Sequence, residues 1–301
     1  MLSWSQLDGV LRDLGLPLPG RRVTLDVAGK VVLITGGGDG IGLALARVLH
    51  RRGATVALVD VDGESLQAAA RELGSRVLTM PADVRDRTAV TVAIHDVVER
   101  AGGLDIVVAG AGVTPPPATL RQIEPAEFDR VLDVNLTGVF NTVRAAADAV
   151  IARRGHIVVV SSVASFTPGP GGAAYMVSKA AVEQLGRALR LELAGHGATV
   201  GIAYFGFVDT RLARTTVDDD PLGRRLMQQL PAPLRSRLAP EDAALVIADG
   251  IARRAGATMA PGAWQVWSLL RGVASAVTDG VLAADRELRA LVRDLEARHP
   301  A

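Results

Sequence analysis

Short apolar runs rich in Val and Ile recur along the chain, and a longer segment rich in Ala, Leu and Arg follows each of them. The runs lack polar alternation, which is typical of strands buried on both faces of a sheet. The intervening segments are long enough for crossover helices, so the pattern predicts an α/β fold: a doubly wound parallel sheet of about seven strands flanked by helices. The expected strands cover residues 30–35, 55–60, 77–80, 106–109, 156–161 and 199–204, with a weaker seventh at 257–260.

The two ends of the chain differ from this alternation. Residues 1–27 open with a capping-box arrangement from Ser3 to Gln6 and spaced apolar residues, which predicts a short helical extension. Residues 28–262 form the expected main domain. Residues 263–301 contain an apolar segment and then a predicted amphipathic helix, whose stripe is Val281, Ala284, Leu288, Leu291 and Leu295.

Charge and cysteine content exclude several classes of function. The chain has 33 Lys and Arg against 32 Asp and Glu, which leaves no strong field to attract nucleic acid or an anionic membrane. It has no cysteine, and its five histidines have no metal-ligand spacing, so we expect neither disulfides nor a metal site. No apolar stretch approaches the roughly 20 residues of a membrane span. Charged residues interrupt the first apolar residues, so we expect a cytoplasmic protein without a signal peptide.

A glycine-rich segment follows the first expected strand directly and leads into a helical pattern. Its sequence is TGGGDGIG, residues 35–42. Glycines let the backbone approach phosphates closely, and the free N–H groups of a following helix favour negative charge. Such a segment alone can be an ordinary turn, but a strand before it and a helix after it predict a site for the diphosphate of a dinucleotide. The expected contacts are Gly36, Gly38, Asp39, Gly40 and Ile41.

A carboxylate ends the second expected strand, about twenty residues past the glycine segment. There Asp60 can accept hydrogen bonds from the hydroxyls of an adenosine ribose, and it would repel a 2′-phosphate. Neither the glycine segment nor the residues right after Asp60 offer an Arg or Lys to neutralise that phosphate. We therefore expect NAD(H), with NADP(H) less favoured. The alternative is a solvated Asp that opens the turn at residues 60–63.

Tyr175 and Lys179 lie four residues apart in a segment with helical spacing, so both side chains share one helix face. A phenol is a poor base at neutral pH, but a nearby ammonium group stabilises the phenolate and lowers its pKa. Tyr175 can then exchange a proton with a substrate oxygen while hydride moves at carbon. At the end of the fifth strand, Ser162 can donate a hydrogen bond to the same oxygen, and Ser161 is the competing candidate.

One polar residue interrupts a helical pattern between the fourth and fifth expected strands. Asn135 stands in the segment VNLTG, residues 134–138, although Asn is not a preferred residue inside a helix. A kink in the helix or a role in holding a water molecule would explain it. The expected catalytic residues are therefore Asn135, Ser162, Tyr175 and Lys179.

These motifs together resemble the classical short-chain dehydrogenase/reductase family, from about residue 29 to residue 210. The matching positions, in order and correctly spaced, are the glycine segment, Asp60, Asp83-Val84, Asn135, Ser162 and Tyr175-x-x-x-Lys179. The resemblance implies a Rossmann-type sheet and an oxidoreductase whose acid/base is Tyr175 and whose substrate is oriented by Ser162. It also implies that Lys179 binds the nicotinamide ribose and tunes Tyr175, and that Asn135 holds a relay water. Further cofactor contacts implied are Asp83 at the adenine, Val84, Ala111, Gly112, Val208, and Thr210 near the carboxamide.

Two positions depart from the family pattern. After the fourth strand the family usually has Asn-Asn-Ala-Gly, whereas this chain has AGAG at residues 109–112. After the sixth strand the usual Pro-Gly is Phe205-Gly206. Neither change removes a proton-transfer group, so we expect an active enzyme, with a non-catalytic cofactor-binding scaffold as the alternative. A sugar-nucleotide epimerase is disfavoured by the glycine spacing and by the lack of a large carboxyl-terminal substrate domain.

The substrate class and the assembly are predicted from two features of composition. Charged residues are nearly absent between residues 255 and 270, so we expect a lipophilic secondary alcohol or ketone. It would approach over an apolar rim made by the helix near residues 281–295 with Trp264, Val266, Trp267, Leu269 and Leu270. Alternatively, these side chains close the core or cover a subunit surface. Small residues in the helices that begin near Phe128 and Tyr175 suit close packing, so a homodimer or homotetramer is expected.

Overall fold

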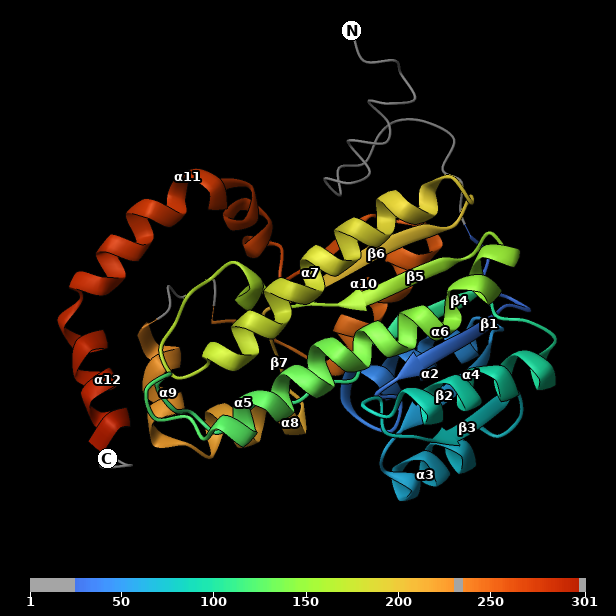
Figure 1. Cartoon of the computed structure of the whole chain (residues 1–301), viewed down its shortest axis with the longest axis horizontal. Helices are drawn as coiled ribbons and strands as arrows, with labels where there is room; N and C mark the ends of the chain where they lie inside the picture. Colours follow the sequence, from blue (N-terminus) through green and yellow to red (C-terminus); the bar gives the residue numbers. More distant parts are fainter. Residues whose placement is uncertain (1–24, 230–234, 298–301) are drawn as a thin grey trace, which may run out of the picture.

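The computed structural model describes residues 25–229 and 235–297, and its centre is a sheet of seven parallel strands (Figure 1). The strand order is β3-β2-β1-β4-β5-β6-β9. This confirms the doubly wound sheet, because the chain moves outward in opposite directions from β1 and β4. The strands are β1 (Val31–Thr35), β2 (Thr55–Asp60), β3 (Val77–Pro81), β4 (Ile106–Ala109), β5 (His156–Val160), β6 (Thr199–Phe205) and β9 (Ala257–Ala260).

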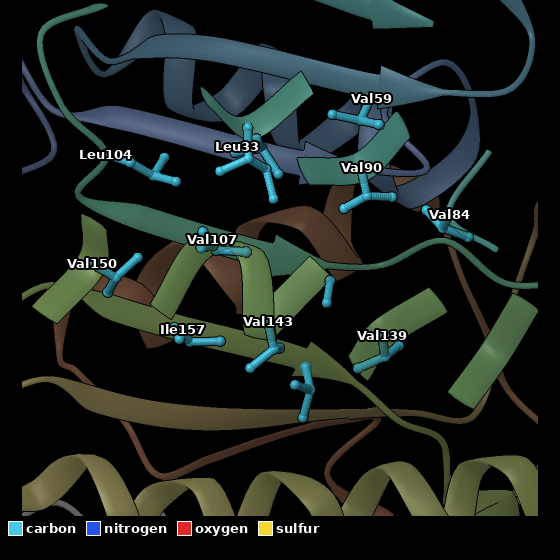
Figure 2. Packing of buried hydrophobic residues seen from close by; sticks show 14 of the residues in the cluster. Leu33, Val59, Val84, Val90, Leu104, Val107, Val139, Val143, Val150 and Ile157 are labelled. Atoms are coloured by element: carbon cyan, nitrogen blue, oxygen red, sulfur yellow. The ribbon is translucent and has the colours of Figure 1, made fainter. Parts of the chain in front are cut away.

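Helices cover both faces of this sheet and bury an apolar cluster on each. On one face α2 and α10 contact each other and pack, together with α3, on the sheet. On the other face lie α4, α6 and α7; Figure 2 shows Val107 and Ile157 of the strands beside Val143 of α6. Burial on both faces explains the unbroken Val and Ile runs. The helices are α2 (Gly40–Arg51), α3 (Gly63–Leu73), α4 (Arg87–Ala101), α5 (Pro125–Leu132), α6 (Gly138–Ala152), α7 (Ala173–Ala194) and α10 (Pro240–Ala252).

Between β6 and α10 the chain forms short elements that the sequence pattern did not indicate. Two strands of two residues each, β7 (Phe207–Val208) and β8 (Arg237–Leu238), pair in parallel away from the main sheet. Between them lie α8 (Arg211–Ala213), a π-helical turn η3 (Arg214–Asp218) and α9 (Pro221–Gln229). The two strands, α8 and η3 have too few residues to show a hydrophobic periodicity.

The carboxyl-terminal extension consists of two helices that curve away from the sheet and return beside α9 (Figure 1). They are α11 (Ala263–Ala284) and α12 (Arg286–Ala297). The prediction of one continuous helix over residues 281–295 is wrong, because Asp285 has an extended backbone and its side chain accepts the N–H of Leu288 at 2.8 Å. The apolar stripe of α12, from Leu288 to Leu295, packs on Leu222 of α9.

The predicted apolar rim also needs correction. Trp264 is only 1% exposed and packs on Val163, so it closes the core. Val266 and Leu269 are exposed, at 63% and 65%. The predicted amino-terminal helix, with its capping box, falls on residues 1–24, outside the described residues. In the described ranges, no helix has the length and apolar character needed to cross a membrane.

Candidate functional site

The glycine segment joins β1 to α2 in a tight cradle. A Cβ at Gly42 would overlap the carbonyl oxygen of Gly36, and Gly36 itself has a φ of 72°. A Cβ at Gly36 would also lie 3.0 Å from the backbone of Ala111. Only glycine tolerates these positions. The result is a backbone surface at the amino end of α2, which suits a diphosphate group.

Asp60 lies half-buried at the end of β2, with its carboxylate turned toward this cradle. One oxygen accepts the N–H of Gly38 at 3.0 Å, and the other accepts the N–H of Asp62 at 3.1 Å. The carboxylate that caps α3 is that of Asp62, which accepts the N–H groups of Glu64 and Ser65. Asp60 is therefore a fixed negative charge beside the glycine segment.

A cation that sequence analysis missed also reaches the cradle. Arg211, the first residue of α8, lies 3.2 Å from a carboxylate oxygen of Asp39. Both side chains are more than half exposed, so the pair is a weak link between α8 and the glycine segment. A second contact joins the same two elements, since a Cβ at Gly40 would lie 3.2 Å from the methyl carbon of Thr210. The only sequence signal for Arg211 was its position next to Thr210.

Three further predicted cofactor residues lie beside these elements. The Arg85 guanidinium beside Asp83 holds the pKa of that carboxyl below its usual value. Val84 is buried against Gly138, so that a Cβ at Gly138 would overlap the side chain of Val84. Val208 is buried in β7. The N–H of Ala82 donates to the carbonyl of Asp60 at 2.9 Å, which keeps the ends of β2 and β3 together.

The segment after β4, where the family amides are replaced, is held by a hydroxyl. The Thr35 oxygen accepts the N–H groups of Gly110 at 3.1 Å and Ala111 at 3.3 Å. Gly112 follows in a narrow space: a Cβ there would lie 3.3 Å from the amide oxygen of Asn135 and 3.5 Å from the Lys179 nitrogen. Thr35 thus ties this segment to β1 without a side-chain amide.

Asn135 is fully buried in a π-helical turn, η1 (Asp133–Thr137), between α5 and α6. Its amide nitrogen donates to the Val113 carbonyl at 2.9 Å and to the Ser178 hydroxyl at 3.0 Å. Its amide oxygen accepts the N–H of Val113 at 2.7 Å. The π turn explains why Asn interrupts a helical pattern, since such turns break the regular ladder and expose polar groups.

The two serines after β5 have different partners. Ser161 donates its hydroxyl hydrogen to the backbone carbonyl of Lys179 at 2.8 Å, so it ties β5 to α7. Ser162 donates to the carbonyl of Phe205 at 3.2 Å, and its hydroxyl acts to lower the pKa of Tyr175. The geometry therefore favours Ser162 as the substrate-facing hydroxyl. It also gives Phe205, which replaces the usual proline, a backbone contact with the site.

Tyr175 and Lys179 lie on the first turns of α7, next to Ser162. The Lys179 nitrogen is 5.6 Å from the centroid of the Tyr175 ring and donates to the Val160 carbonyl at 3.0 Å. Burial lowers the pKa of Lys179 to about 8. Burial also raises the pKa of Tyr175, and the Ser162 hydrogen bond opposes this. In the protein alone the pKa of Tyr175 is thus raised, opposite to the lowering that the sequence predicted from Lys179.

The short chain dehydrogenase family model matches residues 30–221. The chain belongs to the short-chain dehydrogenase family. Nodulation protein G of Rhizobium sp. (strain N33) is 35% identical to this dehydrogenase over 207 residues, which are 68% of this chain and 83% of that protein. (+)-Borneol dehydrogenase 2 of Salvia officinalis is 38% identical over 63% of this chain and 68% of its own. A short-chain dehydrogenase/reductase from Burkholderia phymatum, solved in complex with NAD, has a TM-score of 0.75 at 24% identity and covers 84% of this chain and 96% of its own.

The dehydrogenase is therefore an oxidoreductase of CH–OH and keto groups that uses a nicotinamide cofactor. Its predicted site residues come from strand ends, loops, the turn η1 and α7, and the doubly wound fold places such residues at the carboxyl edge of the sheet. Among the residues that the structure describes, no group of three or more His, Asp or Glu is placed to hold a metal ion. Sequence analysis missed Arg211 and a carboxylate farther along α7, Glu183.

Proposed function

We propose that this dehydrogenase interconverts a secondary alcohol and its ketone with Tyr175 as the acid/base. The observation that carries the proposal is that the buried nitrogen of Lys179 lies 5.6 Å from the centroid of the Tyr175 ring, on the helix next to Ser162. The nicotinamide, when bound, supplies or accepts the hydride. In oxidation, the Tyr175 phenolate takes the proton of the substrate hydroxyl, while the Ser162 hydroxyl donates a hydrogen bond to the same oxygen. In reduction, Tyr175 returns that proton.

Lys179 and Asn135 support this proton transfer. The positive charge of Lys179 favours the phenolate, and its nitrogen would also hold the nicotinamide ribose. Asn135 holds the backbone of Val113 and the hydroxyl of Ser178, so it ties η1 to the segment after β4 and to α7. A relay water beside Asn135 would return protons from Tyr175 to solvent.

NAD(H) is the cofactor that these residues fit best. The diphosphate would lie against Gly36, Gly38, Gly40 and Ile41, the ribose hydroxyls would bond Asp60, and the adenine would meet Asp83 and Val84. The nicotinamide end would lie near Ala111, Gly112, Val208 and Thr210. A 2′-phosphate would meet the carboxylates of Asp60 and Asp62, whereas Arg211 is paired with Asp39.

A lipophilic substrate fits the cavity on the extension side. This cavity, of about 480 Å³, lies between the loop at residues 168–170 and the extension helices. Most of its wall is apolar, including Leu282, Leu288 and Val292, and Arg289 and Arg293 also line it. The loop reaches the catalytic helix, because a Cβ at Gly169 would lie 3.3 Å from the terminal carbon of Met176. The similarity to a protein named for borneol, a lipophilic secondary alcohol, supports the same substrate class.

A homologous series of methyl ketones, assayed by NADH absorbance, tests the proposal. Each buried methylene should contribute about 0.8 kcal/mol, so kcat/KM should rise roughly fourfold per added carbon until the cavity is full. NADPH should support slower turnover than NADH. Turnover of short, polar ketones only, or equal use of NADPH, would contradict the substrate and cofactor assignments respectively.

We also propose that residues 28–262 form the catalytic unit, residues 263–301 form its substrate-side extension, and copies of the chain pair as a dimer or tetramer. Phe140 on α6 and Val177 on α7 are 41% and 50% exposed, which supports an apolar contact along these two helices. Light scattering at micromolar concentration tests the assembly. A monomer there would contradict it.

A further inference from the structure

Glu183 is a buried carboxylate that the proposed proton transfer does not use. It lies one turn beyond Lys179 on α7, on the same face, and is only 5% exposed. One of its oxygens accepts the hydroxyl hydrogen of Ser165 at 2.9 Å. Ser165 ends the short 3₁₀ turn η2 (Val163–Ser165), which begins directly after Ser162. Glu183 therefore connects α7, the helix of Tyr175 and Lys179, to η2, which directly follows Ser162 and is called the serine turn below.

The same carboxylate binds the carboxyl-terminal extension. Arg271, on α11, donates from both terminal nitrogens to the two oxygens of Glu183, at 2.6 Å and 2.9 Å. The Arg271 guanidinium also lies 5.3 Å from the centre of the Phe166 ring, directly after the serine turn. Nearer the start of α11, Trp264 packs on Val163. Two residues of α11 thus contact this region: Trp264 packs on the serine turn, and Arg271 lies over Phe166 directly after it.

A two-pronged ion pair of this kind specifies geometry more than it adds stability. Arg and a carboxylate match each other through two parallel hydrogen bonds, which fix both distance and angle. The desolvation of two charges offsets much of their attraction, so the net stabilisation is small. A pair kept at this junction is better suited to setting where α11 lies than to holding the fold together.

We propose that Glu183 and Arg271 are positioning residues that dock the extension on the serine turn and thereby set the shape of the substrate cavity. The inference rests on the proposed roles of Ser162 and of that cavity. Neither residue is part of the proposed cofactor cradle or donates to the reacting oxygen. Loss of the pair should therefore change the KM for a lipophilic ketone and leave NADH binding unchanged.

The test begins with Arg271→Leu in a Trp4→Phe background. Two of the three tryptophans, Trp264 and Trp267, lie on α11, so their emission then reports the docking of this helix without any substrate. We expect a red shift of the emission, a KM about tenfold higher for a long-chain ketone, and an unchanged Kd for NADH. The matched control is Arg187→Leu, which removes the same charge beside the same junction but leaves the Glu183 bonds intact.

A conservative series separates positioning from simple stabilisation. Arg271→Lys and Glu183→Gln keep part of the hydrogen bonding and should give KM values between those of the parent and Arg271→Leu. A purely structural pair would lower the melting temperature across this series while KM and emission at 25 °C stay at parental values, and that result would overturn the proposal. If the parent turns over no ketone, the substrate assignment fails, and the emission shift alone then decides whether the pair docks α11.

Discussion

The sheet region and the carboxyl-terminal extension are built on different principles. In the sheet, strand residues such as Leu33, Ile34 and Val107 are completely buried, and the cofactor cradle is held by backbone contacts of glycines. The extension leaves Val266 and Leu269 exposed and is attached through side chains, by the pair of Arg271 with Glu183, by ion pairs of α12, and by the small apolar clusters around Trp264 and Leu291. The proposed chemistry thus lies on the part whose core is continuous, and the proposed substrate wall lies on a peripheral part that can vary without disturbing it.

The largest expected effect is that of Tyr175→Phe, which should change kcat and leave cofactor binding unchanged. Removal of one hydroxyl should lower kcat by about 1,000-fold, since proton transfer contributes on the order of 10²–10⁴-fold. The NADH Kd should stay at the parental value, because the cradle keeps its contacts. The chain supplies its own control, as the other of its two tyrosines, Tyr204, is buried behind the site, and Tyr204→Phe should retain activity. Substantial turnover by Tyr175→Phe would assign the chemistry to another group.

Within the sheet region, Asp60→Ala tests the cofactor side. Hydrogen bonds to a charged group contribute about 1.5–3 kcal/mol, so the NADH Kd should rise roughly 30-fold. NADPH binding should weaken less or improve, because a repelling charge is removed. Asp96→Ala, on α4, is the control for loss of one negative charge at an exposed position. An unchanged ratio of NADH to NADPH affinity would show that Asp60 plays no part in discrimination.

The contrast between the regions also explains what the sequence could predict. Each strand of the sheet was found within one residue of its end, because buried parallel strands carry an unbroken apolar run. The glycine segment, Asp60 and Ser162 could be singled out because they end or directly follow strands, whereas Asn135, Tyr175 and Lys179 were singled out by motif and spacing, and the roles of all of them stay predictions. Arg211 with Asp39 and Arg271 with Glu183 could not be found, since nothing local marks which charges meet across the fold. The break at Asp285 was missed because the apolar stripe continues across it.

On the extension side, a smaller effect is expected from Val292→Thr. The change keeps the shape of a side chain that lines the cavity but adds a hydroxyl, which opposes burial of an apolar chain by about 1 kcal/mol. The kcat/KM for a long-chain ketone should fall about fivefold, and that for a short ketone should hardly change. Val281→Thr is the control, because Val281 is 64% exposed. An equal loss of kcat/KM for both ketones would show that Val292 does not contact the substrate chain.

The smallest effect concerns pH and the far end of the sheet. His156 begins β5, is 1% exposed, and shares a hydrogen bond of 2.8 Å with the Thr199 hydroxyl. Burial, with lesser contributions from the charges of Arg254 and Arg190, lowers the pKa of His156 to about 3. Between that value and an unfolded pKa of about 6.5, only the unfolded chain binds the proton, so stability is lost as the pH falls.

This linkage lowers the free energy of unfolding by roughly 1 kcal/mol at pH 6 relative to pH 8. Urea unfolding of His156→Gln, followed by circular dichroism, should therefore show a smaller loss between pH 8 and pH 6 than the parent. His95→Gln, at an exposed position of α4, should behave as the parent does. Parallel curves for the parent and His156→Gln would contradict the buried neutral imidazole. Tryptophan emission recorded in the same titration compares the two regions. Because the extension is attached through side chains at the edge of the molecule, the emission should change at a lower urea concentration than the circular dichroism signal of the sheet. This emission change should not depend on the residue at position 156.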